Sequence, residues 1–186
     1  MDERVNARDV IGASVIRGAA IGELCAAPYF LWDVRCLRAG REIWRETFRN
    51  TVMTAGKNDL LDKYFAGSAY TAAWYGGLIS LTSYTTGINA ADTMASHSGW
   101  IEDVAYSNAN RVTAAFSAAA AGAKALSSPM AFNINGTTTI KGLFMTTGNG
   151  KSGTSGILYS AGLFTGGDKA VANGDTLNVS GTWTIT

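Results

Sequence analysis

Short runs of alternating apolar and polar residues occur near the start of the chain and throughout its second half. Residues 29–38 and 41–50 alternate on either side of Ala39-Gly40, a pattern that predicts a β-hairpin. In the second run, Trp44, Glu46 and Phe48 fall on one face, and the residues between them fall on the other. One face of this hairpin is therefore expected to meet the core.

Residues 56–65 have the spacing of a helix instead. Four large apolar residues fall at i, i+1, i+4 and i+5, and Gly67 follows where a C-terminal cap is expected. These four residues are Leu60, Leu61, Tyr64 and Phe65. A stripe of this kind usually faces the interior, so we expect it to be buried.

Further strands are predicted from short apolar runs, many of them bounded by turn residues. The expected strands are residues 73–81, 111–118, 130–134, 138–146, 156–164 and 176–186. Residues 83–108 are polar and irregular, with a possible helical turn at 91–96. Three Asn-Gly pairs, at 135–136, 149–150 and 173–174, favour tight hairpin turns. The chain is thus expected to be mainly β, an antiparallel β-sandwich or jelly-roll with one principal short helix.

The first 27 residues differ from this pattern, because glycines interrupt them and no regular period appears. A helix over 7–16 is weakened by these glycines. We therefore expect an N-terminal assembly arm at residues 1–27, followed by a β-sandwich domain at 28–186. The side chains of the arm that are expected to contact a partner are Arg4, Arg8, Ile11, Val15, Ile16, Arg17, Ile21 and Leu24.

Charge adds to this interpretation, because only 16% of the residues are charged and the net charge is +1. Such a balance argues against strong attraction to nucleic acid or to an anionic membrane. Eight of the nine arginines lie at or before Arg49. Arginine is enriched at protein interfaces, so the first fifty residues are expected to meet a partner. The alternative is a solvated, charged pair of strands.

Candidate chemistry is sparse. The single histidine, His97, is expected to make structural contacts, and Cys25 and Cys36 are expected to be small buried hydrophobic residues. Residues 148–152, GNGKS, lack the first glycine of a phosphate-binding loop and fall in a predicted hairpin. We therefore expect no catalytic, cofactor or metal site. No signal peptide or apolar run of about 20 residues is visible, so we expect synthesis in a cytoplasm.

Several blocks, in a fixed order over about residues 42–180, resemble a family of small structural proteins of tailed-bacteriophage virions. The blocks are Trp44 with Phe48-Arg49-Asn50, residues 54–62, residues 73–75 with Gly77-Leu78, residues 91–100, Tyr106-Ser107 with Arg111, residues 166–168 and residues 174–179. The resemblance implies a small β-sandwich component of the phage particle. It leaves a position on the head or in the tail open.

The resulting hypothesis is a non-enzymatic capsid cement or decoration protein that bridges major capsid subunits and forms homo-oligomers on the virion. Buried interface added to an assembled shell stabilises that shell. The alternatives are a tail, tail-tip or fibre-associated protein and, less favoured, a carbohydrate-binding β-sandwich that uses some of the five tryptophans.

Overall fold

The computed structural model describes residues 28–67 and 73–184, and these form one helix and eleven antiparallel strands. Eight strands follow one another across the sheet in the order β4-β3-β8-β9-β2-β1-β11-β6, and β5, β7 and β10 pair beside this path. The elements are β1 Tyr29–Arg38, β2 Arg41–Val52, α2 Thr54–Phe65, β3 Tyr75–Ser80, β4 Glu102–Asp103, β5 Val112–Thr113, β6 Ala123–Ala125, β7 Met130–Asn133, β8 Thr138–Thr146, β9 Leu158–Leu163, β10 Lys169–Val171 and β11 Asp175–Thr184.

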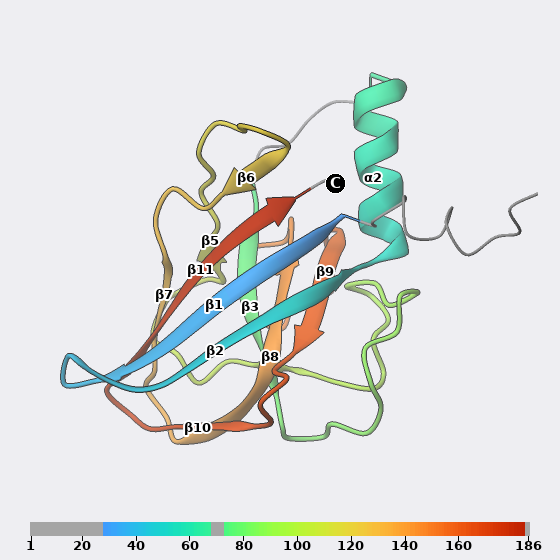
Figure 1. Ribbon diagram of the computed structural model, residues 1–186. Helices are drawn as coiled ribbons and strands as arrows, with labels where there is room; N and C mark the ends of the chain where they lie inside the picture. Colours follow the sequence, from blue (N-terminus) through green and yellow to red (C-terminus); the bar gives the residue numbers. More distant parts are fainter. Residues whose placement is uncertain (1–27, 68–72, 185–186) are drawn as a thin grey trace, which may run out of the picture.

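The sheet folds over so that its two halves form facing layers. Strands β1, β2 and β11 make one layer, and β3, β8 and β9 make the other (Figure 1). Strand β2 joins the layers, because it pairs with β1 along most of its length and with β9 through Thr51 and Val52. The main core lies between the layers and includes Trp32, Phe132 and Leu143. The mainly β, sandwich-like expectation is therefore confirmed.

The hairpin of β1 and β2 matches its prediction closely. Ala39 and Gly40 have φ of 48° and 78°, the positive values that a two-residue turn between twisted strands requires. Glu46 and Phe48 are buried, and the intervening Arg45 and Thr47 are exposed, so the two predicted faces of this strand are confirmed. Alternation in this part of the sequence is clear because only one face of these strands meets the core.

The strands of the other layer are buried on both faces. In β3, Leu78 belongs to the main core, while the adjacent Ile79 belongs to a second apolar cluster. That cluster lies on the opposite face of the layer and includes Met94 and Trp100 from the segment 81–101. The irregular segment 81–101 thus acts as a cover for the sheet, which explains why it contains buried apolar residues without forming a helix or a long strand.

Helix α2 includes the predicted residues 56–65, and Gly67 has a φ of +65°, as its capping role requires. The expectation of a buried stripe is wrong. Leu61, Tyr64 and Phe65 are 52%, 80% and 77% exposed. The helix packs through its first turn, where a Cβ on Gly56 would come within 2.6 Å of the Tyr159 carbonyl oxygen. The side of the later turns that carries Leu61, Tyr64 and Phe65 has no layer to pack against, because the helix extends beyond the strand ends (Figure 1).

Two further predictions need correction. The strand expected at 111–118 is limited to Val112–Thr113, followed by an isolated bridge between Phe116 and Leu126. The possible helical turn at 91–96 is a bridge between Thr93 and Ser96. Neither segment has a neighbouring strand that pairs with it along its whole length. A local sequence pattern does not show whether such a neighbour is present.

Candidate functional site

The eight predicted interface residues, from Arg4 to Leu24, lie outside the described residues, as does the rest of the N-terminal arm. The description of the chain begins at Pro28, just before β1.

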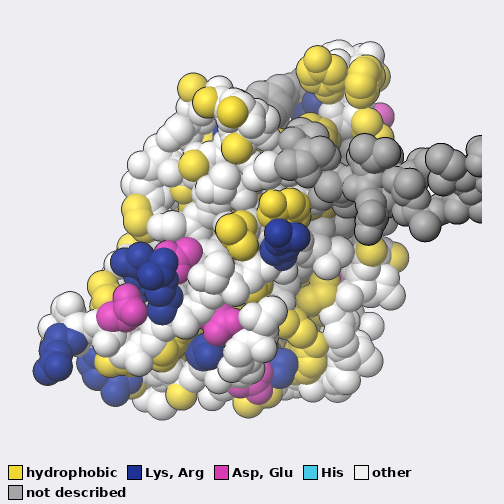
Figure 2. Space-filling model, in the orientation of Figure 1, with side chains coloured by type: hydrophobic (Ala, Val, Ile, Leu, Met, Phe, Trp, Pro, Cys, Tyr) yellow, Lys and Arg dark blue, Asp and Glu magenta, His cyan; other side chains and the backbone are white. Residues whose placement is uncertain are grey.

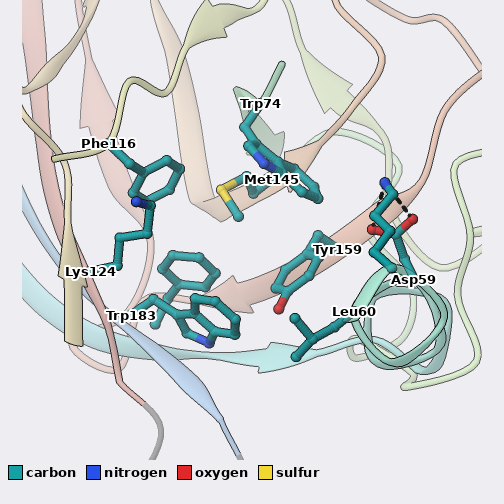
Figure 3. Close-up of a pocket in the computed structure, with 10 residues that line it drawn as sticks. Asp59, Leu60, Trp74, Phe116, Lys124, Met145, Tyr159 and Trp183 are labelled. Carbon is teal, nitrogen blue, oxygen red and sulfur yellow. Dashed lines mark hydrogen bonds and ion pairs between the residues drawn. The ribbon is translucent and has the colours of Figure 1, made fainter. Parts of the chain in front are cut away.

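An aromatic cavity of about 120 Å³ opens at this end of the sandwich. It lies between the ends of the two layers, and α2 forms one of its sides (Figure 3). The residues that line this aromatic cavity are Phe30, Asp59, Leu60, Lys63, Trp74, Phe116, Lys124, Met145, Tyr159 and Trp183. Phe30 comes from the first strand and Trp183 from the last, so the ends of the described domain meet here.

The rings of the cavity pack tightly against one another. Phe30 stacks on Trp183 with ring centroids 6.0 Å apart, and Tyr159 meets Trp183 edge to face at 5.9 Å. Trp74 contacts Tyr159 from the other side at 5.0 Å. Contacts of this kind hold aromatic side chains in defined orientations. The cavity is therefore built with fixed walls.

Two polar atoms of this cavity's residues are buried and lack a hydrogen-bond partner: the Tyr159 hydroxyl and Trp183 Nε1. Tyr159 is only 4% exposed, and its hydroxyl points towards the space between Trp183 and Leu60 (Figure 3). Burial, with a contribution from the Asp59 carboxylate, raises the pKa of Tyr159, so the phenol remains protonated. Leaving such a group unpaired costs about 1–3 kcal/mol. The atoms therefore mark a place where a hydrogen-bond acceptor would be stabilised.

Charged groups at the rim already have partners. The Lys63 ammonium lies 2.8 Å from the Asp59 carboxylate, one helical turn away. Lys124 donates a hydrogen bond of 2.7 Å to the Ser117 carbonyl oxygen. The cavity is thus apolar inside with engaged charges at its edge, an arrangement that suits an apolar group carrying an acceptor.

A second cavity, of about 300 Å³, lies beside the buried ion pair of Glu102 and Arg111. Both side chains are almost fully buried, and Arg111 Nη2 lies 2.8 Å from Glu102 Oε2. Arg111 also donates to the carbonyl oxygens of Gly148 and Gly153, each at 2.9 Å. Glu102 accepts further bonds from Ser152 N–H and from the Tyr106 hydroxyl. The pair therefore fastens the loop between β8 and β9 to the sheet.

The residues considered for catalysis or phosphate binding make structural contacts. His97 stacks on Trp100 at 4.1 Å, and its Nδ1 lies 2.9 Å from the Trp100 carbonyl oxygen. The GNGKS loop joins β8 to β9, and Lys151 donates to the Tyr106 carbonyl oxygen. Glu102 and the adjacent Asp103 bind different partners, since Asp103 accepts from Ser80 and Thr138.

The arginines of the hairpin largely pair with carboxylates of the same chain (Figure 2). Asp33 lies between Arg35 and Arg45, at 3.4 and 2.6 Å. Arg38 makes a bidentate pair with the buried Asp175, whose pKa it lowers to about 2. These arginines therefore have carboxylate partners within the chain, as the alternative of a solvated, charged pair of strands implies.

Cys36 is buried, as expected for a small apolar residue. Burial, followed by the charge of the nearby Asp175, raises the pKa of this thiol to about 12, so it stays protonated at neutral pH. Cys25 lies outside the described residues.

Within residues 28–67 and 73–184, no group of three or more His, Cys, Asp or Glu side chains gathers where a metal ion would bind. In the same part of the chain, no helix has the length and apolar character needed to span a membrane.

A comparison with models of known protein families finds no match to this chain, and a comparison with curated proteins finds no significant relative.

Proposed function

We propose that this chain is a non-enzymatic structural protein of a tailed-phage virion, a capsid cement or decoration protein that binds the major capsid protein and copies of itself. The blocks shared with the phage family support the virion part of this proposal. The sandwich-like fold agrees with the form that the resemblance implies.

A single observation supports an adhesive role: one end of the domain concentrates apolar and aromatic side chains around the point where the N-terminal arm begins. The aromatic cavity opens there and is lined in part by α2, which also carries the exposed Leu61, Tyr64 and Phe65. Hydrophobic side chains gather at the free end of this helix (Figure 2). Aromatic anchors and the pockets that receive them contribute much of the binding energy at protein interfaces. This end is therefore the proposed contact surface.

The protein would act by binding to the shell. A protein that binds only the assembled shell lowers the free energy of that shell by its binding energy, and so raises the cost of separating capsid subunits. No proton or group transfer is required. The residues of the arm, from Arg4 to Leu24, would add contacts with a neighbouring subunit.

Copy number in purified particles tests the proposal. We expect hundreds of copies in each virion, and we expect particles that lack the protein to open at a lower temperature. A count of tens or fewer would assign the protein to the tail instead. Absence from washed, intact virions would reject a structural role in the particle.

A further inference from the structure

We propose that the aromatic cavity binds a small neutral molecule, a small ring or a branched aliphatic group that carries one carbonyl-type hydrogen-bond acceptor. The Tyr159 hydroxyl donates to that acceptor, and the aromatic walls hold the apolar part. Binding of this kind goes beyond the proposed function, because the isolated chain is sufficient for it and no capsid is needed. Failure to bind such a molecule would therefore leave the copy number in virions unaffected, and the two are tested separately.

The size of the cavity limits the ligand to one small group. Its volume of about 120 Å³ is slightly below the roughly 150 Å³ of an apolar protein cavity that binds benzene. Phe30, Trp74 and Phe116 supply ring faces, and Leu60 and Met145 supply further apolar contacts. A small ring or a branched aliphatic group fills this space. A sugar is less suitable, because its several hydroxyls would lose hydrogen bonds to water on entry.

Tyr159, the donor of the site, is fixed through both its backbone and its ring. Met53 N–H donates to the Tyr159 carbonyl oxygen at 2.9 Å, and a Cβ on Gly56 would come within 2.6 Å of the same oxygen. Trp74 and Trp183 meet the Tyr159 ring edge to face at 5.0 and 5.9 Å. Groups that are in place before a ligand arrives lose little further freedom on binding. The site is therefore preorganised.

The polar atoms of the cavity call for an acceptor that brings no hydrogen of its own. Tyr159 is 4% exposed, and within residues 28–67 and 73–184 its hydroxyl has no hydrogen-bond partner. The hydroxyl points towards the space between Trp183 and Leu60 (Figure 3). Trp183 Nε1, also buried without a partner in this part of the chain, can only donate. A carbonyl oxygen matches such donors, whereas water brings two hydrogens for which the aromatic walls offer no strong acceptor.

The rim of the cavity favours a neutral ligand over a charged one. The Asp59 carboxylate and the Lys63 ammonium lie 2.8 Å apart and bond to each other. Lys124 donates to the Ser117 carbonyl oxygen at 2.7 Å. A charged ligand would leave water for an apolar interior, and the charges that it would meet are already engaged. Its burial is therefore unfavourable.

NMR titration of the full chain with two isosteric probes tests the site. Cyclopentanone carries the acceptor, and methylenecyclopentane has a CH₂ group in place of the oxygen. Both should bind the wild type and shift the indole N–H signal of Trp183, which Trp183→Phe assigns. Tyr159→Phe should weaken cyclopentanone binding about fivefold, as one neutral hydrogen bond would, and should change methylenecyclopentane binding less than about twofold. Tyr64→Phe, at an exposed tyrosine on α2, is the matched control and should change neither.

Three results of this titration would overturn the proposal. The first is no binding of either probe to the wild type. The second is a Tyr159→Phe variant that binds both probes as the wild type does, or that weakens both equally. The third concerns Leu60→Phe, which adds a ring at the cavity and should weaken both probes by at least about fivefold. Unchanged binding by this variant would place the probes elsewhere.

A charged probe tests the neutrality of the ligand. Cyclobutanecarboxylate should bind at least about tenfold more weakly than cyclobutanecarboxamide, its neutral isostere. The reverse order would overturn the assignment of a neutral ligand.

Thermal melting without a ligand gives an independent readout. Tyr159→Phe should leave Tm unchanged or raise it, because it removes a buried hydroxyl that has no partner among the described residues. A clear fall in Tm would show that the hydroxyl already has an acceptor within the chain, and the proposal would fail.

Discussion

Two cavities among the described residues differ in how their buried polar groups are bonded. Beside the second cavity, Arg111 and Glu102 bond to each other and to the loop between β8 and β9. In the aromatic cavity, Tyr159 and Trp183 each bury a polar atom with no partner. Because the polar groups of Arg111 and Glu102 are bonded within the protein, this network has a structural role. Donors without a partner in a cavity can be satisfied by an acceptor from a ligand or from water, which makes the aromatic cavity the better candidate for binding.

By this criterion the smaller of the two cavities is the better candidate for ligand binding. The second cavity is larger, at about 300 Å³ against about 120 Å³. Its polar groups are nevertheless already committed to the protein, so a ligand would have to compete with Gly148, Gly153 and Ser152 for them. Substitutions in the two regions should therefore affect different properties of the molecule.

The largest effect is expected for Arg111→Met. The change leaves the Glu102 carboxylate buried without its cation, which typically costs about 3–5 kcal/mol. Urea unfolding of the wild type and the variant measures this loss. The double variant Glu102→Gln with Arg111→Met should lose less than Arg111→Met alone, because no buried charge remains unpaired. A loss below about 1 kcal/mol for Arg111→Met would show that the network is not a fastening.

A smaller effect is expected at Asp175, which lies at the end of the sandwich opposite the aromatic cavity. Its carboxylate accepts bonds from Arg38 and from Ala172 N–H, and Asp175→Asn should cost about 2–3 kcal/mol at neutral pH. The pKa of this group is about 2 in the folded protein, against roughly 3.9 when unfolded. Its stabilisation is therefore complete above pH 4 and is lost as the pH falls from about 4 to 2.

Thermal melting from pH 2 to 7 checks this prediction. Wild-type Tm should fall in that acid window, and the dependence should be weaker in Asp175→Asn. Asp168→Asn is the matched control, because Asp168 pairs with Lys141 at the surface, where ion pairs contribute about 0–1 kcal/mol. If Tm depends on pH in the same way for the wild type and Asp175→Asn between pH 2 and 4, Asp175 is not the source of the acid sensitivity.

The sequence predicted the hairpin and β8 almost residue by residue, because alternation and turn residues are local signals. Strand β8 was expected at 138–146 and is observed over Thr138–Thr146. The short strands β4, β6 and β10 were not predicted, since each has two or three residues that pair only through tertiary contacts. The stripe on α2 was misjudged for a related reason. Helical spacing shows which residues share a face, but not whether another layer lies opposite that face.

The aromatic cavity could not be located from sequence. Its rings come from positions as distant as Phe30, Trp74 and Trp183, and only the strand order brings them together. In the last strand, Trp183 packs against the main core that contains Leu177 and Val179. Nothing in the local pattern showed that the Trp183 ring nitrogen would lack a partner.

Deletion of residues 1–27 should have a modest effect on folding and a large one on binding. The described residues after Pro28 form two apolar core clusters with one another, so the truncated protein should fold. Thermal melting measures any loss of stability, and co-sedimentation with particles that lack the protein measures binding. An unfolded product would place the arm within the core. Full occupancy would show that the partner surface lies on the sandwich itself.

The smallest effect on stability is expected at the exposed end of α2. Tyr64 and Phe65 are 80% and 77% exposed and contact each other at 4.8 Å, so replacing both with serine removes little buried area. Tm should change by no more than about 2 °C, as for ordinary surface substitutions. Binding to particles should nevertheless fall at least tenfold if these rings are anchors, since that needs only about 1.4 kcal/mol of lost contact energy. Lys57→Ser, on the same helix and also exposed, is the control for the loss of a large side chain. Unchanged particle binding by the double variant would exclude the helix end from the interface and leave the aromatic cavity and the arm as its remaining parts.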